Sequence, residues 1–120
     1  MNHRSLLTDV RYRGLVNATK RAYHVYEGRD NFILLSPGSD SHGGNYHVIH
    51  RHALNYVMSR VGGNRSVTVR QALDMCRRSK FLRDHFAVLN TLYALAGIKK
   101  ARIVGMKRQA LVFSVSKGAV

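Results

Sequence analysis

The sequence is poor in the residues that mark several common protein classes. Its 120 residues include one cysteine, Cys76, one proline, Pro37, and no tryptophan. A single cysteine cannot form an intramolecular disulfide or a cysteine zinc cluster, which excludes a disulfide-stapled secreted scaffold. No apolar run approaches the roughly 20 residues that a membrane-spanning helix needs, and the first residues lack the apolar core of a secretory signal. The sequence therefore predicts an intracellular protein, in the cytoplasm, nucleoid or nucleus, that has no membrane partner.

Acidic residues are also scarce. Six Asp and Glu oppose twenty Lys and Arg, which gives a formal net charge of +14 and a sequence pI near 11.0. So large an excess of positive charge repels itself and favours a polyanionic partner, of which nucleic acid is the commonest. The alternative is a basic protein that is merely soluble, or one that meets acidic lipids or an acidic protein.

The sequence gives little indication of an enzyme. The six carboxylates include no pair at a spacing suited to general acid–base catalysis. Cys76 falls on the apolar stripe of a predicted helix, which is typical of a small core residue rather than a nucleophile. We therefore expect a non-enzymatic protein without a cofactor.

The positive charge is concentrated in the C-terminal two thirds of the chain. Residues 1–43 carry a net charge of +2, and residues 44–120 carry a net charge of +12. The loop of residues 36–44, which holds the single proline and three glycines, separates the two parts. We expect residues 1–43 to form an extension that packs on the rest or pairs two subunits, and residues 44–120 to form the basic binding module.

The spacing of apolar residues predicts an α+β order of elements. In the N-terminal part it indicates a helix over residues 6–27 and a short strand at 32–35. In the C-terminal part, Thr68 and Asp84 are natural helix N-caps and Gly97 is a natural helix end. The expected C-terminal elements are helices over residues 46–61, 69–76 and 84–96, a stub of strand at 66–67, and strands over 100–106 and 110–116.

This order of elements resembles the winged helix-turn-helix fold over residues 45–116. The resemblance rests on the order helix, short strand, helix, turn, helix, strand, strand, and on the positions of the caps and glycines. It implies a three-helix module with a C-terminal β-hairpin. In such a module the third helix is offered to the major groove of DNA, and the hairpin is the wing that flanks it. The N-terminal helix and short strand would be additions to that fold.

Two basic groups are the predicted contact residues for nucleic acid. Arg and Lys would pair with phosphates and release counterions, which gives an affinity that depends steeply on salt. The third helix has no Arg or Lys between Asp84 and Ala96, so it favours backbone-driven binding over tight base readout. The turn before that helix contributes Arg77, Arg78, Lys80 and Arg83, the helix itself contributes His85, Asn90 and Thr91, and the hairpin contributes Lys99, Lys100, Arg102, Lys107 and Arg108.

The sequence thus predicts a protein that binds double-stranded DNA mainly through its phosphates, in a transcriptional regulatory or architectural role. A homodimer would suit a palindromic site. An RNA-binding ribonucleoprotein or ribosome-associated component is the first alternative, because six tyrosines could stack on bases. A metal-dependent nuclease is the second, since His42, His47 and His50 are weak candidate ligands for zinc. The sequence has no HExxH motif, which favours histidines that merely flank a basic surface.

Overall fold

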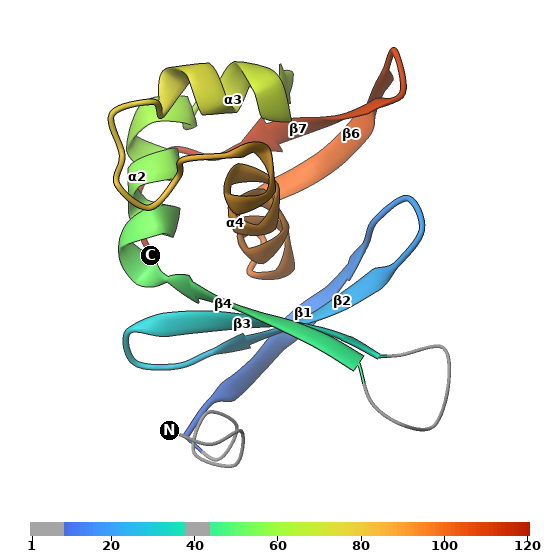
Figure 1. The fold of residues 1–120 in the computed structure, drawn as a ribbon, viewed down its shortest axis with the longest axis vertical. Helices are drawn as coiled ribbons and strands as arrows, with labels where there is room; N and C mark the ends of the chain where they lie inside the picture. Colours follow the sequence, from blue (N-terminus) through green and yellow to red (C-terminus); the bar gives the residue numbers. More distant parts are fainter. Residues whose placement is uncertain (1–8, 38–43) are drawn as a thin grey trace.

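An antiparallel sheet of four strands in sequence order forms one side of the molecule (Figure 1). The computed structural model describes residues 9–37 and 44–120. β-branched and aromatic residues, which favour strands, are frequent in the second and third strands. Val25, Phe32 and Leu34 are buried, and they turn one face of this sheet to the core. The strands are β1 (Arg11–Asn17), β2 (Ala22–Glu27), β3 (Asn31–Pro37) and β4 (Gly44–His50).

The predicted helix over residues 6–27 is wrong, because its described part is the hairpin of β1 and β2. The two strands are joined by a tight turn in which the Ala18 N–H donates to the Arg21 carbonyl oxygen at 2.8 Å. A β-bulge between Tyr12 and Gly14 shifts the alternation of side chains along β1. The apolar residues at helical spacing, Leu15, Ala18, Ala22 and Val25, lie on both strands and in the turn between them, so their spacing does not mark one buried face.

The rest of the chain adds three helices and a smaller sheet. Thr68 and Gln71 form a capping box at the start of the second helix, and Asp84 caps the third by accepting from the Ala87 N–H at 2.8 Å. Both caps are those that the sequence predicts. The helices are α2 (Arg51–Val61), α3 (Val69–Met75) and α4 (His85–Gly97), and β5 (Val67–Thr68), β6 (Ala101–Lys107) and β7 (Ala110–Val115) form a sheet in the order β5-β7-β6.

The first of these helices begins later than the sequence predicts. Residues 46–50 were expected to be helical, but they belong to β4 and pair with β3, for example Ile49 with Phe32. α2 starts at Arg51, directly after this strand. The sheet therefore extends across the boundary that the charge distribution indicates at residues 43 and 44.

α4 is the central element of the fold. In Figure 1 it lies between the four-stranded sheet below and α3 with the β6–β7 hairpin above, while α2 lies beside it. A Cβ placed on Gly97 would lie 2.3 Å from Cγ2 of Val25, and a Cβ on Gly14 would lie 2.7 Å from the Gly97 carbonyl oxygen. Gly97 thus allows α4 to pack closely on the sheet. The turn that ends the helix is made by Lys99, which adopts a left-handed conformation with φ of 67°.

The winged helix-turn-helix interpretation is therefore wrong for this chain. The described residues form a small α+β fold of three helices and seven strands in two antiparallel sheets. Strands replace the expected N-terminal helix, and the sheet that they build covers one side of α4. A winged-helix protein offers this helix to a DNA groove. Here seven of its residues are buried, so α4 is a core helix.

Candidate nucleic-acid interface

The segment between α3 and α4 presents its cations to solvent. Cys76, Ser79 and Leu82 are buried. The Ser79 N–H donates to the Cys76 carbonyl oxygen at 2.9 Å, and the Ser79 hydroxyl oxygen accepts from the Phe81 N–H at 3.1 Å. An irregular segment that is held at three buried points keeps the side chains between them outside. The exposed cations of this segment, all of them predicted from the sequence, are Arg77, Arg78, Lys80 and Arg83.

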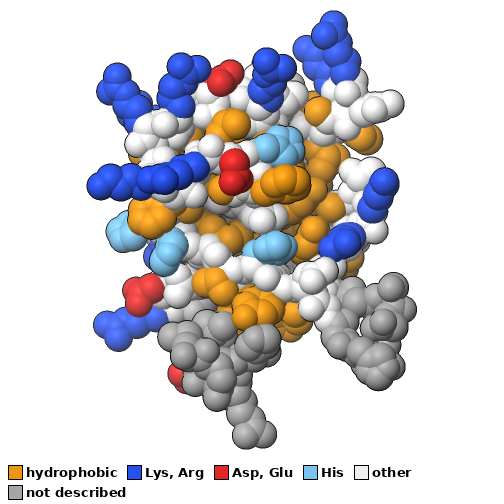
Figure 2. Space-filling model, viewed as in Figure 1, with side chains coloured by type: hydrophobic (Ala, Val, Ile, Leu, Met, Phe, Trp, Pro, Cys, Tyr) orange, Lys and Arg blue, Asp and Glu red, His pale blue; other side chains and the backbone are white. Residues whose placement is uncertain are grey.

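A cleft of about 660 Å³ lies between the tip of the β6–β7 hairpin, α3 and the first turns of α4; we call it the hairpin cleft. Lys107 and Arg108 line it from the hairpin tip, and Arg70 lines it from α3. His85, which the sequence predicts as a contact residue, lies on the α4 side. Thr19, in the turn between β1 and β2, also lines the cleft. Figure 2 shows a face on which hydrophobic, His and a few acidic side chains occupy the middle, while Lys and Arg lie along its upper, left and right borders.

Three cations at or near this cleft were not predicted as contact residues. Lys20 and Arg21 follow Thr19 in the β1–β2 turn and are exposed. Their position depends on a hairpin that the apolar spacing conceals, so the sequence carries no signal for it. The exposure of Arg70 could be predicted from the sequence, because Val69 is on the buried side of the predicted helix and its neighbour Arg70 is left outside.

The structure does not bring the predicted hairpin group together. Lys99 and Arg102 line a separate groove against β1, and Lys100 is exposed beside them. They lie at the opposite end of β6 from Lys107, a distance of roughly 20 Å at about 3.3 Å per residue. We therefore treat these three cations as a second cluster, apart from the hairpin cleft.

Two predicted base-reading residues lie in or near the core. Thr91 is 1% exposed, and its hydroxyl donates to the Ala87 carbonyl oxygen at 2.8 Å. This leaves Thr91 inside the helix packing, with its hydroxyl group already used. Asn90 is half-buried and lines a different groove, between α4 and β4.

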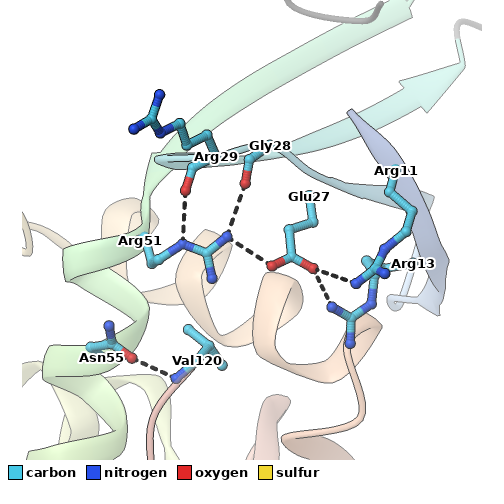
Figure 3. Close-up of polar contacts among 8 residues, drawn as sticks. All are labelled: Arg11, Arg13, Glu27, Gly28, Arg29, Arg51, Asn55 and Val120. Atoms are coloured by element: carbon cyan, nitrogen blue, oxygen red, sulfur yellow. Dashed lines mark hydrogen bonds and ion pairs between the residues drawn. The ribbon is translucent and has the colours of Figure 1, made fainter. Parts of the chain in front are cut away.

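Three arginines form ion pairs with Glu27, the only glutamate of the sequence (Figure 3). Arg51 contacts the Glu27 carboxylate at 2.7 Å, Arg11 contacts it at 3.2 Å, and Arg13 also pairs with it. Arg51 additionally donates to the carbonyl oxygens of Gly28 at 2.9 Å and Arg29 at 3.1 Å. Burial alone raises the pKa of Glu27, but the hydrogen bonds from the three arginines outweigh it, so the pKa is lowered. This cluster ties the start of α2 to β1 and β2 and serves the fold.

Most of the other cations have no anionic partner. Nineteen of the twenty Lys and Arg residues lie in the described parts of the chain. Besides the three that bind Glu27, only Arg77 forms an ion pair there, with Asp74 at 3.4 Å. Both side chains of that pair are largely exposed, so it contributes little stability. The cations around the hairpin cleft and on the segment before α4 therefore produce a positive field that carboxylates do not balance.

The histidines do not form a metal centre in the described structure. His47 and His50 lie on β4, so the helical spacing that would align them is absent, and His42 lies outside the described residues. Residues 9–37 and 44–120 contain no group of three His, Cys, Asp or Glu able to hold a metal ion.

Burial raises the pKa of the Cys76 thiol to about 11, against a weaker opposing effect of Arg60. The core position predicted for Cys76 is confirmed.

Comparison of the chain with protein-family models, with curated proteins and with solved structures finds no significant match. Within the described ranges, no helix has both the length and the apolar character needed to cross a membrane. The candidate interface is thus defined by the exposed cations and the clefts between them.

Proposed function

We propose that the chain binds nucleic acid mainly through the phosphate backbone. The observation that supports this most directly is an excess of cations over carboxylates on one part of the surface. These cations border the hairpin cleft or lie on the segment before α4. Surface arginine and lysine usually alternate with acidic residues, whereas here Asp74 and Asp84 are the only carboxylates in these stretches. We call this set the basic face: Arg70, Arg77, Arg78, Lys80, Arg83, Lys107 and Arg108.

Counterion release drives binding by the basic face. Each cation that neutralises a phosphate frees condensed counterions, so the affinity rises as the salt concentration falls. Guanidinium groups can also form two parallel hydrogen bonds with one phosphate. Because most of α4 is buried, the contacts come from the segment before it, the hairpin tip and the start of α3. Such contacts carry little sequence information.

The turn of the β6–β7 hairpin supports a functional role for its tip. Arg108 has φ of 51° and Gln109 has φ of 67°, and this left-handed conformation is the one that hairpin turns normally assign to glycine or asparagine. Each such residue costs of order 1–2 kcal/mol relative to a relaxed backbone. Despite this cost, the turn keeps Arg108 at the tip of the hairpin, beside the cleft.

The basic face does not by itself favour DNA over RNA. The preference for duplex DNA depends on a groove-reading third helix, and α4 is mostly buried; phosphate contacts are available from DNA and RNA alike. A regulatory or architectural role stays a prediction.

The test is a binding titration with labelled duplex DNA, single-stranded DNA and single-stranded RNA over a range of salt concentrations. We expect binding whose logarithm falls linearly with the logarithm of salt, with a slope of about −0.9 for each phosphate contacted on a duplex. If every cation of the basic face made a contact, the slope would be near −6, roughly. Absence of binding to all three probes at 50 mM salt, or an affinity that salt does not change, would overturn the proposal.

A further inference from the structure

A second groove, with a volume of about 350 Å³, lies between β4 and the first turns of α4; we call it the β4 groove. Small residues, Ala53 and Ala87, lie along it together with Asn90, and aromatic and imidazole side chains border it. The residues that line it are Tyr46, His47, Val48, Ile49, His50, Ala53, Phe81, Ala87, Asn90 and Thr91. Its volume is at the low end of the range for small-molecule pockets, roughly 300–1,000 Å³.

Phe81 presents an exposed aromatic ring at this groove. The ring is 49% exposed, although phenylalanine is a residue that folding normally buries. Its neighbours are also flat rings: the His50 ring lies 5.2 Å away, and the His52 ring lies 6.4 Å away at an interplanar angle of 17°. Phe86, in the first turn of α4, is still more exposed, at 71%.

The Asn90 amide is a free hydrogen-bonding group in the β4 groove. Asn90 is half-buried, and its side chain makes no hydrogen bond with any residue of the described structure. Phe86 and Asn90 are four residues apart on α4, so they are neighbours on its surface. An amide can donate to and accept from the edge of a nucleobase at the same time.

Positive charge lies beside this groove and favours an anionic occupant. Lys80 precedes Phe81 in the sequence and Arg83 follows two residues after it, and both cations are exposed without an ion pair. α4 separates the β4 groove from the hairpin cleft, since His85 and Leu89 line the cleft whereas Ala87 and Asn90 line the groove. A polyanionic strand held by the basic face would therefore lie close to Phe81, which is in the same segment as Lys80 and Arg83, and to the exposed first turn of α4 that carries Phe86.

We propose that the β4 groove receives an unpaired base of the bound nucleic acid, stacked on Phe81 and hydrogen-bonded to the Asn90 amide. A charged groove with aromatic rings is the common design of single-strand binding sites. A base within a duplex is stacked on its neighbours and cannot enter, so the groove selects single-stranded segments. This inference rests on the proposed function and adds the structural class of its ligand.

The experiment uses oligonucleotides, as DNA and as RNA, that carry one 2-aminopurine, whose fluorescence falls when the base stacks. We expect the wild-type protein to quench the fluorescence of the single strands and to bind them more tightly than the matched duplex. Phe81→Leu keeps an apolar side chain but removes the aromatic ring. It should weaken single-strand binding by about 5- to 150-fold, the range of base–aromatic stacking, and should abolish quenching. Asn90→Ala should weaken it without abolishing the quenching.

Tyr12→Leu is the matched control, because Tyr12 is equally exposed, at 49%, but lies on β1. It should leave affinity and quenching unchanged. Equal affinity for single strands and duplexes, with no quenching and no effect of Phe81→Leu, would overturn the inference. Salt-dependent binding in the same experiment would still support the proposed function. Absence of binding to every probe would overturn both. Circular dichroism of each variant identifies any loss of binding that comes from unfolding.

Discussion

Substitution of Gly97 by alanine tests whether α4 packs against the four-stranded sheet. An added Cβ would lie 2.3 Å from Cγ2 of Val25 and 2.7 Å from its Cβ, whereas ordinary van der Waals contact begins near 3.4 Å. Val25 is fully buried on the core face of β2, and it cannot move aside. Either α4 or β2 must therefore shift.

The sign of the effect separates a core helix from a surface helix. Overpacking of a well-filled core costs about 1–3 kcal/mol. Replacing a glycine inside a helix by alanine returns about 1 kcal/mol. The difference leaves a net cost of up to about 2 kcal/mol, and the 2.3 Å contact places Gly97→Ala toward that upper end. We therefore expect the free energy of unfolding to fall by up to about 2 kcal/mol, with a drop in Tm of up to roughly 8 °C. A helix exposed to solvent at this point would instead gain about 1 kcal/mol from the same change.

Thermal and urea denaturation of four variants measure this effect. Gly105→Ala is the matched control, since a Cβ there meets nothing within 4 Å, and its Tm should be unchanged or slightly raised. Val25→Ala removes the closest atom, so Gly97→Ala should cost less in that background, with a coupling of about 1 kcal/mol. A Tm that rises with Gly97→Ala, or perfect additivity with Val25→Ala, would refute this packing.

Three further predictions concern the turns, the glutamate cluster and the cysteine. Lys99→Gly and Gln109→Gly each relieve a left-handed residue and should raise the free energy of unfolding by about 1 kcal/mol; a lower Tm would contradict the assigned turns. The pKa of Glu27 is lowered by folding, so its stabilisation is complete above pH 4.5 and is lost as the pH falls through the folded-state pKa. Glu27→Gln should therefore cost about 1–3 kcal/mol at pH 7 and should reduce the loss of stability in acid, as denaturation at both pH values would reveal. The Cys76 thiol, buried and with a pKa of about 11, should react with a thiol reagent only after unfolding, and rapid labelling of the native protein would be the opposite result.

The helix caps and the C-terminal hairpin could be predicted from the sequence, whereas the four-stranded sheet could not. Thr68 and Asp84 act through contacts within a few residues, and such local signals are visible in a sequence. Gly97 was correctly placed at the end of a helix, but its reason is the approach of Val25 from another element. The bulge after Tyr12 interrupts the alternation of side chains in β1, and the helical spacing of apolar residues from Leu15 to Val25 runs across the turn into β2.

The candidate site was also partly predictable, because some of its features depend only on local sequence. The exposure of Arg78 and Arg83 follows from the local pattern of buried and polar residues in their segment. The approach of the β1–β2 turn to the β6–β7 hairpin is a tertiary event, so the position of Lys20 could not be foreseen. Asn90, a predicted contact residue, lies in a groove that β4 helps to form, and the sequence gives no indication of that groove.

The basic face is tested most directly by the salt dependence of nucleic-acid binding in two variants that lose the same charge. One replaces Arg78, Lys80 and Arg83 of the basic face by glutamine, and the other replaces Lys99, Lys100 and Arg102 of the second cluster by glutamine. We expect the first variant to flatten the salt slope by about one unit per lost contact and the second to leave the slope at the wild-type value. Equal slopes in both variants and the wild type would contradict the basic face as the site of binding.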